Sequence, residues 1–109
     1  MPASLPYCVA TATGETLEFT FPLHPDTGSA VVVSQLLSAL LKVLDNELKL
    51  HGEISNGDVL QAAAMALAVR ARMIHAPMEQ TGPLAAQLLE TALEAADAAL
   101  SDEPLSGRA

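Results

Sequence analysis

Apolar residues recur at every second position near the N-terminus of this chain, at Leu17, Phe19 and Phe21. This two-residue period is typical of a strand with one buried face. Thr13 and Gly14 precede it and provide a tight turn, so residues 6–23 are predicted to form a β-hairpin. A two-residue turn at these positions pairs Cys8 with Phe19. We therefore expect Cys8 to lie on the apolar face as a buried small hydrophobic residue.

From Ala30 to Leu50 the apolar residues recur at spacings of three and four, which predicts a long helix. Its core-facing positions are predicted to be Val33, Leu37, Leu40, Leu44 and Leu48. A second apolar set widens this surface well past one side of the helix: Val32, Leu36, Val43 and Leu50. We expect the helix to contact the core on one side and something else on the other.

Gly52 is expected to end this helix, and Ser55 followed by Asp58 resembles the capping box that begins another. The second helix is predicted over residues 56–75 and is rich in alanine. Its small side chains, among them Ala62 and Ala66, would let a neighbouring helix approach closely.

A third helix is predicted to start near Pro83, a residue favoured in the first helical turn, and to run to about Ser101. The predicted fold is α+β and mostly α, with an N-terminal β-hairpin followed by three helices in an antiparallel bundle. We expect residues 1–101 to form a single domain and residues 102–109 to be a flexible tail.

Composition narrows the function classes. Half of the 109 residues are hydrophobic, mean hydropathy is +0.33 and net charge is -8. A small domain has difficulty hiding so much apolar surface, which favours self-association. Without a basic stripe, nucleic acids and anionic membranes are poor partners. No apolar run reaches the roughly 20 residues that cross a bilayer, and the N-terminus lacks signal-peptide features. Together with a lone Cys8, this predicts a cytoplasmic protein.

No spacing in the sequence indicates catalytic, cofactor-binding or metal-binding residues, and none are predicted. His51 and His75 sit at predicted helix ends, where the helix dipole favours a positive charge. An acidic face on the last helix, formed by Glu90, Glu94 and Asp97, is a candidate surface for a basic protein partner.

These patterns favour a non-enzymatic protein-protein interaction domain that forms a homodimer and acts as an adaptor, assembly factor or regulator. The candidate dimer face comprises Val32, Leu36, Val43, Ala62 and Ala66. The alternative is a small-ligand-binding or enzymatic subunit with an apolar pocket between hairpin and helices. Its lining would be Phe19, Phe21, Met65 and Met73, with Tyr7, His24 or Arg70 at the mouth.

Overall fold

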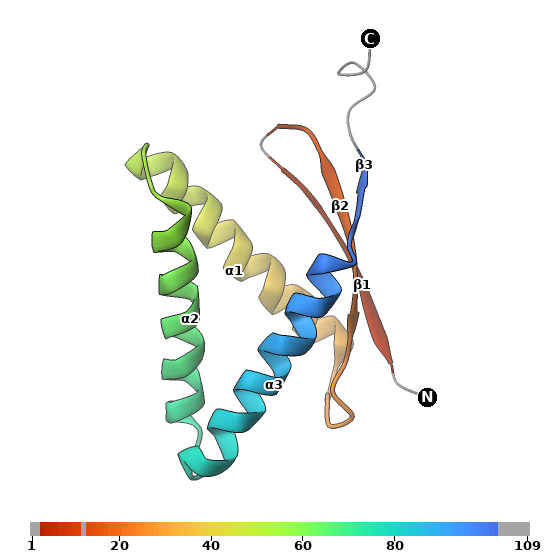
Figure 1. The fold of residues 1–109 in the computed structure, drawn as a ribbon, viewed down its shortest axis with the longest axis vertical. Helices are drawn as coiled ribbons and strands as arrows, with labels where there is room; N and C mark the ends of the chain where they lie inside the picture. Colours follow the sequence, from red (N-terminus) through yellow and green to blue (C-terminus); the bar gives the residue numbers. More distant parts are fainter. Residues whose placement is uncertain (1–2, 12, 103–109) are drawn as a thin grey trace. The chain divides into compact units, whose positions relative to one another are not determined.

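A computed structural model describes residues 3–11 and 13–102 of the chain (Figure 1). It is α+β and mostly α, with a hairpin followed by three helices as the sequence patterns predict. A short strand follows the last helix. The elements in chain order are β1 Ser4–Ala10, β2 Thr16–Pro22, α1 Ala30–His51, α2 Asn56–Met73, α3 Met78–Asp97 and β3 Leu100–Asp102.

The three strands form one antiparallel sheet in the order β1-β2-β3. Tyr7 pairs with Phe19 and Val9 with Leu17, so β1 and β2 contribute apolar side chains to the same face. These side chains are half-buried, and the Phe19 and Phe21 rings stack with their centroids 5.2 Å apart. The opposite face carries exposed side chains, among them Ser4, Cys8 and Glu18. The sheet therefore has one apolar and one solvated face.

The hairpin register differs by one residue from the predicted one, and Cys8 is exposed rather than buried. The turn closes between Thr11 and Glu15, whose backbone N–H and carbonyl bond at 2.7 Å, instead of around Thr13 and Gly14 alone. The Thr11 hydroxyl also accepts from the Glu15 N–H, and Gly14 takes a φ of 88° that favours glycine. Because side chains alternate faces, a shift of one residue moves Cys8 to the solvated face, opposite Glu18.

Helix α1 begins after Ser29, whose side chain accepts from the Val32 N–H, and ends at His51. Gly52 follows in the left-handed conformation, with a φ of 76°, and its N–H bonds to the Leu48 carbonyl. This arrangement satisfies a carbonyl left open at the helix end. Gly52 therefore ends α1 as predicted.

Helix α2 has the predicted N-cap, because the Ser55 side chain accepts from the Asp58 N–H at 3.2 Å. Helix α3 begins at Met78, five residues before the predicted start, and contains Pro83. The Pro77 carbonyl accepts from the N–H groups of Gln80 and Thr81, which builds a first turn ahead of the proline. Pro83 therefore lies inside α3 and removes one donor from its hydrogen-bond ladder.

Strand β3 was not anticipated, because the predicted third helix covered Leu100 and Ser101 and the predicted flexible tail began at Asp102. Helix α3 ends at Asp97, and Leu100 and Ser101 pair with Glu18 and Leu17 of β2. The Ser101 hydroxyl also donates a hydrogen bond to the Glu15 carboxylate. Of the predicted tail, residues 103–109 lie outside the described part of the chain.

The chain divides into two compact units, each described separately. One unit combines residues 1–34 with residues 89–109 and contains the sheet. The other spans Gln35–Leu88 and contains α2, most of α1 and the first half of α3. Within the second unit the chain reverses direction at Gly52 and again before Met78, as Figure 1 shows. The prediction of one domain over residues 1–101 stays a prediction.

Candidate interaction surfaces

Helix α1 has two apolar faces. The first is a half-buried stripe at spacings of four and three: Ala30, Ser34, Leu37, Leu41, Leu44 and Leu48. The second is exposed, with Leu36 at 60%, Leu40 at 64%, Val43 at 59% and Leu50 at 78% of their full exposure. At 3.6 residues per turn, the two faces lie roughly 120° apart around the helix. We call the second one the open face of α1.

The open face corrects one part of the predicted core stripe. Leu40 and Val33 were expected to face the core, and both are exposed. Leu41 takes the inner position instead, between Leu37 and Leu44. Spacings of three and four fit several neighbouring stripes on a helix that is apolar over more than half its circumference, so the pattern alone did not choose among them.

Helix α2 is exposed on every side along its middle. All residues from Gln61 to Arg70 are exposed, and Met65 and Val69 each retain 57% of their full exposure. Only Ala71, near the C-terminal end, is buried. The other elements of its own unit thus leave the alanine-rich turns exposed, whereas the sequence pattern predicted close packing against a neighbouring helix.

All five residues of the candidate dimer face are exposed: Val32, Leu36, Val43, Ala62 and Ala66. Val32, Leu36 and Val43 lie on α1, and Ala62 and Ala66 lie on α2. Their assignment to an interface stays a prediction. Their exposure leaves these side chains available to another molecule.

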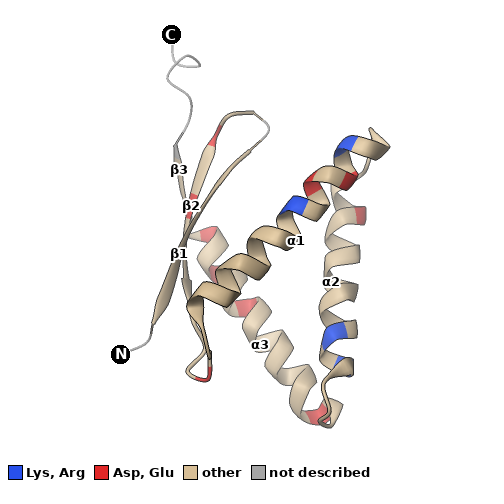
Figure 2. Cartoon of the chain, turned by 180° about the vertical axis from the view of Figure 1, so that it is seen from behind, with Lys and Arg blue, Asp and Glu red and all other residues tan. Residues whose placement is uncertain are grey.

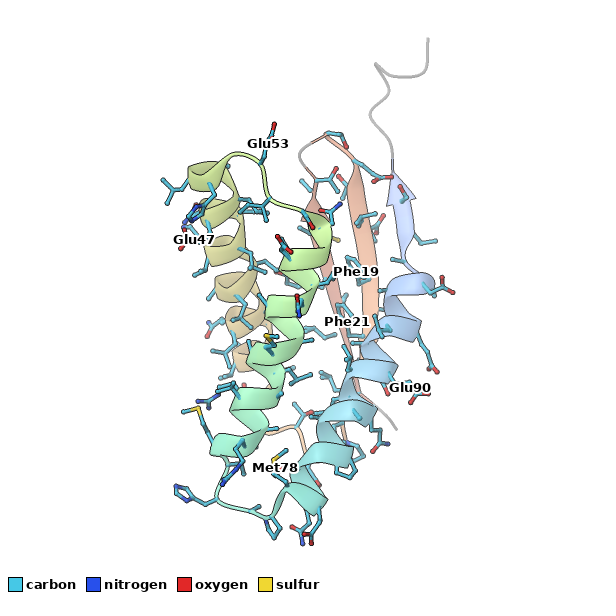
Figure 3. All side chains as sticks on the ribbon, turned by 60° about the vertical axis from the view of Figure 1, so that its left-hand side comes forward. Phe19, Phe21, Glu47, Glu53, Met78 and Glu90 are labelled. Carbon is cyan, nitrogen blue, oxygen red and sulfur yellow. The ribbon has the colours of Figure 1, made fainter. Side chains whose placement is uncertain are left out.

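The acidic face lies on the second half of α3 and includes Glu90, Glu94 and Asp97, all exposed. Figure 2 shows acidic residues along α3 and basic residues toward the C-terminal ends of α1 and α2. The salt bridges of the described residues join His24 to Asp26 and His51 to Glu47, so none involves this face. Glu90 extends away from α3 in Figure 3. Among the described residues, none forms a salt bridge with these three exposed carboxylates.

The residues suggested for a ligand pocket lie in both units. Phe19 and Phe21 belong to the sheet, while Met65, Met73 and Arg70 belong to α2. Met65 and Met73 are largely exposed, and the Arg70 guanidinium lies 3.6 Å from the Met73 sulfur. His24 takes part in a turn, where its Nδ1 accepts from the Asp26 N–H. The pocket stays a prediction.

The described residues include no cluster of three or more histidine, cysteine, aspartate or glutamate side chains arranged to hold a metal ion. Over the same residues, no helix is both long and apolar enough to span a bilayer. His51 lies at the end of α1, as predicted, with its Nε2 3.7 Å from a Glu47 carboxylate oxygen one turn earlier. This pair supports a helix terminus rather than a ligand site.

Comparison with known proteins adds no functional information. No protein-family model matches this sequence, and neither a curated protein nor a solved structure gives a match. The candidate surfaces therefore rest on the residues and geometry of this chain alone.

Sequence reasoning missed how far α2 is exposed. The signal was present in its composition: six of the ten residues in Gln61–Arg70 are alanine or glutamine, and of the larger ones Met65 and Val69 lie on one side while Leu67 lies on nearly the opposite side. A helix that packs on its own core normally shows one apolar stripe of at least 100°. Such an even distribution predicts weak attachment to the core.

Proposed function

We propose that this protein is a non-enzymatic interaction domain that works as a homodimer, in the role of an adaptor, assembly factor or regulator. The observation that carries this proposal is the open face of α1, where Leu36, Leu40, Val43 and Leu50 are all more than half exposed. Several large apolar side chains exposed along one side of a helix are typical of protein interfaces. A second copy of the protein carries the same face and is always present in solution, so it can cover this surface.

The energetics support a symmetric pairing. Covering the exposed part of each of these four side chains is worth roughly 1 to 2 kcal/mol, or roughly 8 to 16 kcal/mol over two copies. Association costs about 4 to 15 kcal/mol in lost freedom of motion. The open face of α1 therefore roughly balances that cost, and further buried surface is needed for a stable dimer.

The acidic face supports a second, basic protein partner. Glu90, Glu94 and Asp97 repel one another at spacings of four and three, and a cationic surface would relieve this repulsion. Such charge matching mainly raises the association rate and is weakened by salt. We place the protein in the cytoplasm, since its lone Cys8 is exposed as a free thiol and a reducing compartment maintains that state.

Light scattering after size exclusion, from micromolar to tens of nanomolar protein, tests the homodimer. We expect a dimer at the high end of this range. The variant Leu40→Lys with Val43→Lys places two charges on the open face and is expected to yield monomers. The matched control, Gln35→Lys with Asn46→Lys, adds the same charge on the polar side of α1 and should remain dimeric. A monomer at every concentration for the unmodified protein overturns the proposal.

A further inference from the structure

The exposed middle of α2 carries a heptad-like face with opposite charges at its two ends. Asp58, Ala62, Met65, Val69 and Arg72 follow one another at spacings of four, three, four and three. These spacings place all five residues along one side of the helix, as in the seam of a coiled coil. All five are exposed. We call them the α2 seam.

The charges define a direction. Figure 2 shows the acidic residue near the start of α2 and the basic residues near its end. If two copies of α2 run parallel, Asp58 meets Asp58 and Arg72 meets Arg72, and both contacts are repulsive. If they run antiparallel, each Asp58 meets the Arg72 of the partner subunit. Charge complementarity therefore favours an antiparallel second copy.

The seam is also symmetric about its own centre. Asp58 lies seven residues before Met65 and Arg72 lies seven residues after it. A two-fold axis through Met65 consequently brings both charge pairs together at once, and it sets Ala62 near Val69 of the partner subunit. The pairing of a small with a larger side chain permits close approach of the two helices.

We propose that α2 pairs with α2 of a second copy, antiparallel, about a two-fold axis at Met65. This inference rests on the proposed homodimer and names the surface that completes it. The open face of α1 alone does not bury enough surface for a stable dimer, and the α2 seam supplies additional buried area. The seam also fixes the relative direction of the two α2 helices.

Single cysteines test the geometry in the full-length chain, in a Cys8→Ser background. Met65→Cys should give a covalent dimer with a short bifunctional maleimide, because the two copies of this residue meet at the axis. Asp58→Cys alone should give at least about tenfold less covalent dimer than Met65→Cys, because the position-58 cysteines of the two subunits lie roughly 21 Å apart along the helices. An equimolar mixture of Asp58→Cys and Arg72→Cys chains should cross-link. Self-cross-linking through position 58 indicates parallel pairing and overturns the inference.

Charge exchange provides a second test. Asp58→Arg and Arg72→Asp should each raise the dimer dissociation constant about tenfold, because each creates two like-charge contacts. The double variant Asp58→Arg with Arg72→Asp should return it to near the original value. Both changes oppose the helix dipole, so recovery in the double variant cannot arise from a more stable helix. Arg70→Asp is the matched control, because Arg70 lies on nearly the opposite side from Arg72 and should leave the constant within about twofold.

Light scattering on the same samples separates the two proposals. A dimer that fails to cross-link through Met65→Cys, or that shows no recovery on charge exchange, overturns the α2 seam and leaves the homodimer standing. A monomer at all concentrations overturns both.

Discussion

The hydroxyl of Ser101 donates a hydrogen bond to the carboxylate of Glu15, joining β3 to the turn residue that directly precedes β2. The two residues are 86 positions apart in sequence, and the bond lies beside the pairing of Ser101 with Leu17. It anchors β3, a strand of three residues, against the edge of the hairpin.

We predict that Ser101→Ala lowers the free energy of unfolding by about 1 kcal/mol, because the hydrogen bond has an ionised acceptor but is exposed to solvent. Urea titration at fixed protein concentration measures the change. Ser4→Ala, an exposed serine of β1, is the control and should have little effect. Equal losses in the two variants would show that the Glu15 contact contributes nothing.

A second prediction concerns the exposed thiol. Cys8 should react with a thiol reagent in the folded protein at a rate within about tenfold of the urea-unfolded chain, because its side chain lies on the solvated face of the sheet. The rate of absorbance change on adding an aromatic disulfide measures this. Strong protection in the folded state would support the other register, in which Cys8 faces Phe19.

The difference between these two registers shows which features of the hairpin can be predicted from the sequence. Alternating apolar residues such as Phe19 and Phe21 identify a strand reliably, because the pleat itself has a period of two. The register depends on the turn, and the same residues permit a turn closed by Ala12 and Glu15 or one closed by Thr11 and Glu15. The Thr11 hydroxyl accepts an additional hydrogen bond from the Glu15 N–H in the observed turn, and the alternation of apolar residues along the strand does not encode this contact.

Helix ends were predicted correctly where a residue ends or begins a helix through a single known interaction or conformation. Ser55 accepts a backbone N–H at the start of α2, and Gly52 takes a left-handed conformation at the end of α1, as their chemistry requires. Pro83 misled because proline is favoured in the first turn but is tolerated further in when the preceding turn is otherwise satisfied. The exposed surfaces of α1 and α2 follow in part from their patterns, because α1 is apolar around more than half its circumference and α2 has no wide apolar stripe. Which of the neighbouring α1 positions stay exposed depends on packing that the pattern does not encode.

A third prediction addresses the end of α1. Gly52→Ala should reduce the free energy of unfolding by about 1 kcal/mol, because a side chain at a φ of 76° is strained even though nothing lies within 4 Å of the added carbon. Gly28→Ala is the matched control: it also has open space around it but no positive φ, so its effect should be small. Thermal unfolding of both variants at one protein concentration makes the comparison. Similar destabilisation by the two substitutions would argue against the left-handed turn at Gly52.

The last prediction concerns the charges at the two ends of α3. Asp97 is the final residue of this helix, whose last turn contains no basic residue, so its carboxylate meets the negative end of the helix dipole. Asp97→Asn should therefore raise the free energy of unfolding by roughly 0.3 to 1 kcal/mol at low ionic strength. Glu79 lies in the first turn, where a negative charge is favourable, and Glu79→Gln should lower the free energy of unfolding by a similar amount.

Urea titrations at low and high salt measure the effects of both substitutions. The opposite signs separate the dipole from a general effect of reducing net charge, because each substitution removes one negative charge from a chain of net charge -8. Stabilisation by both variants would assign the effect to net charge, and high salt should diminish either effect because the groups are exposed.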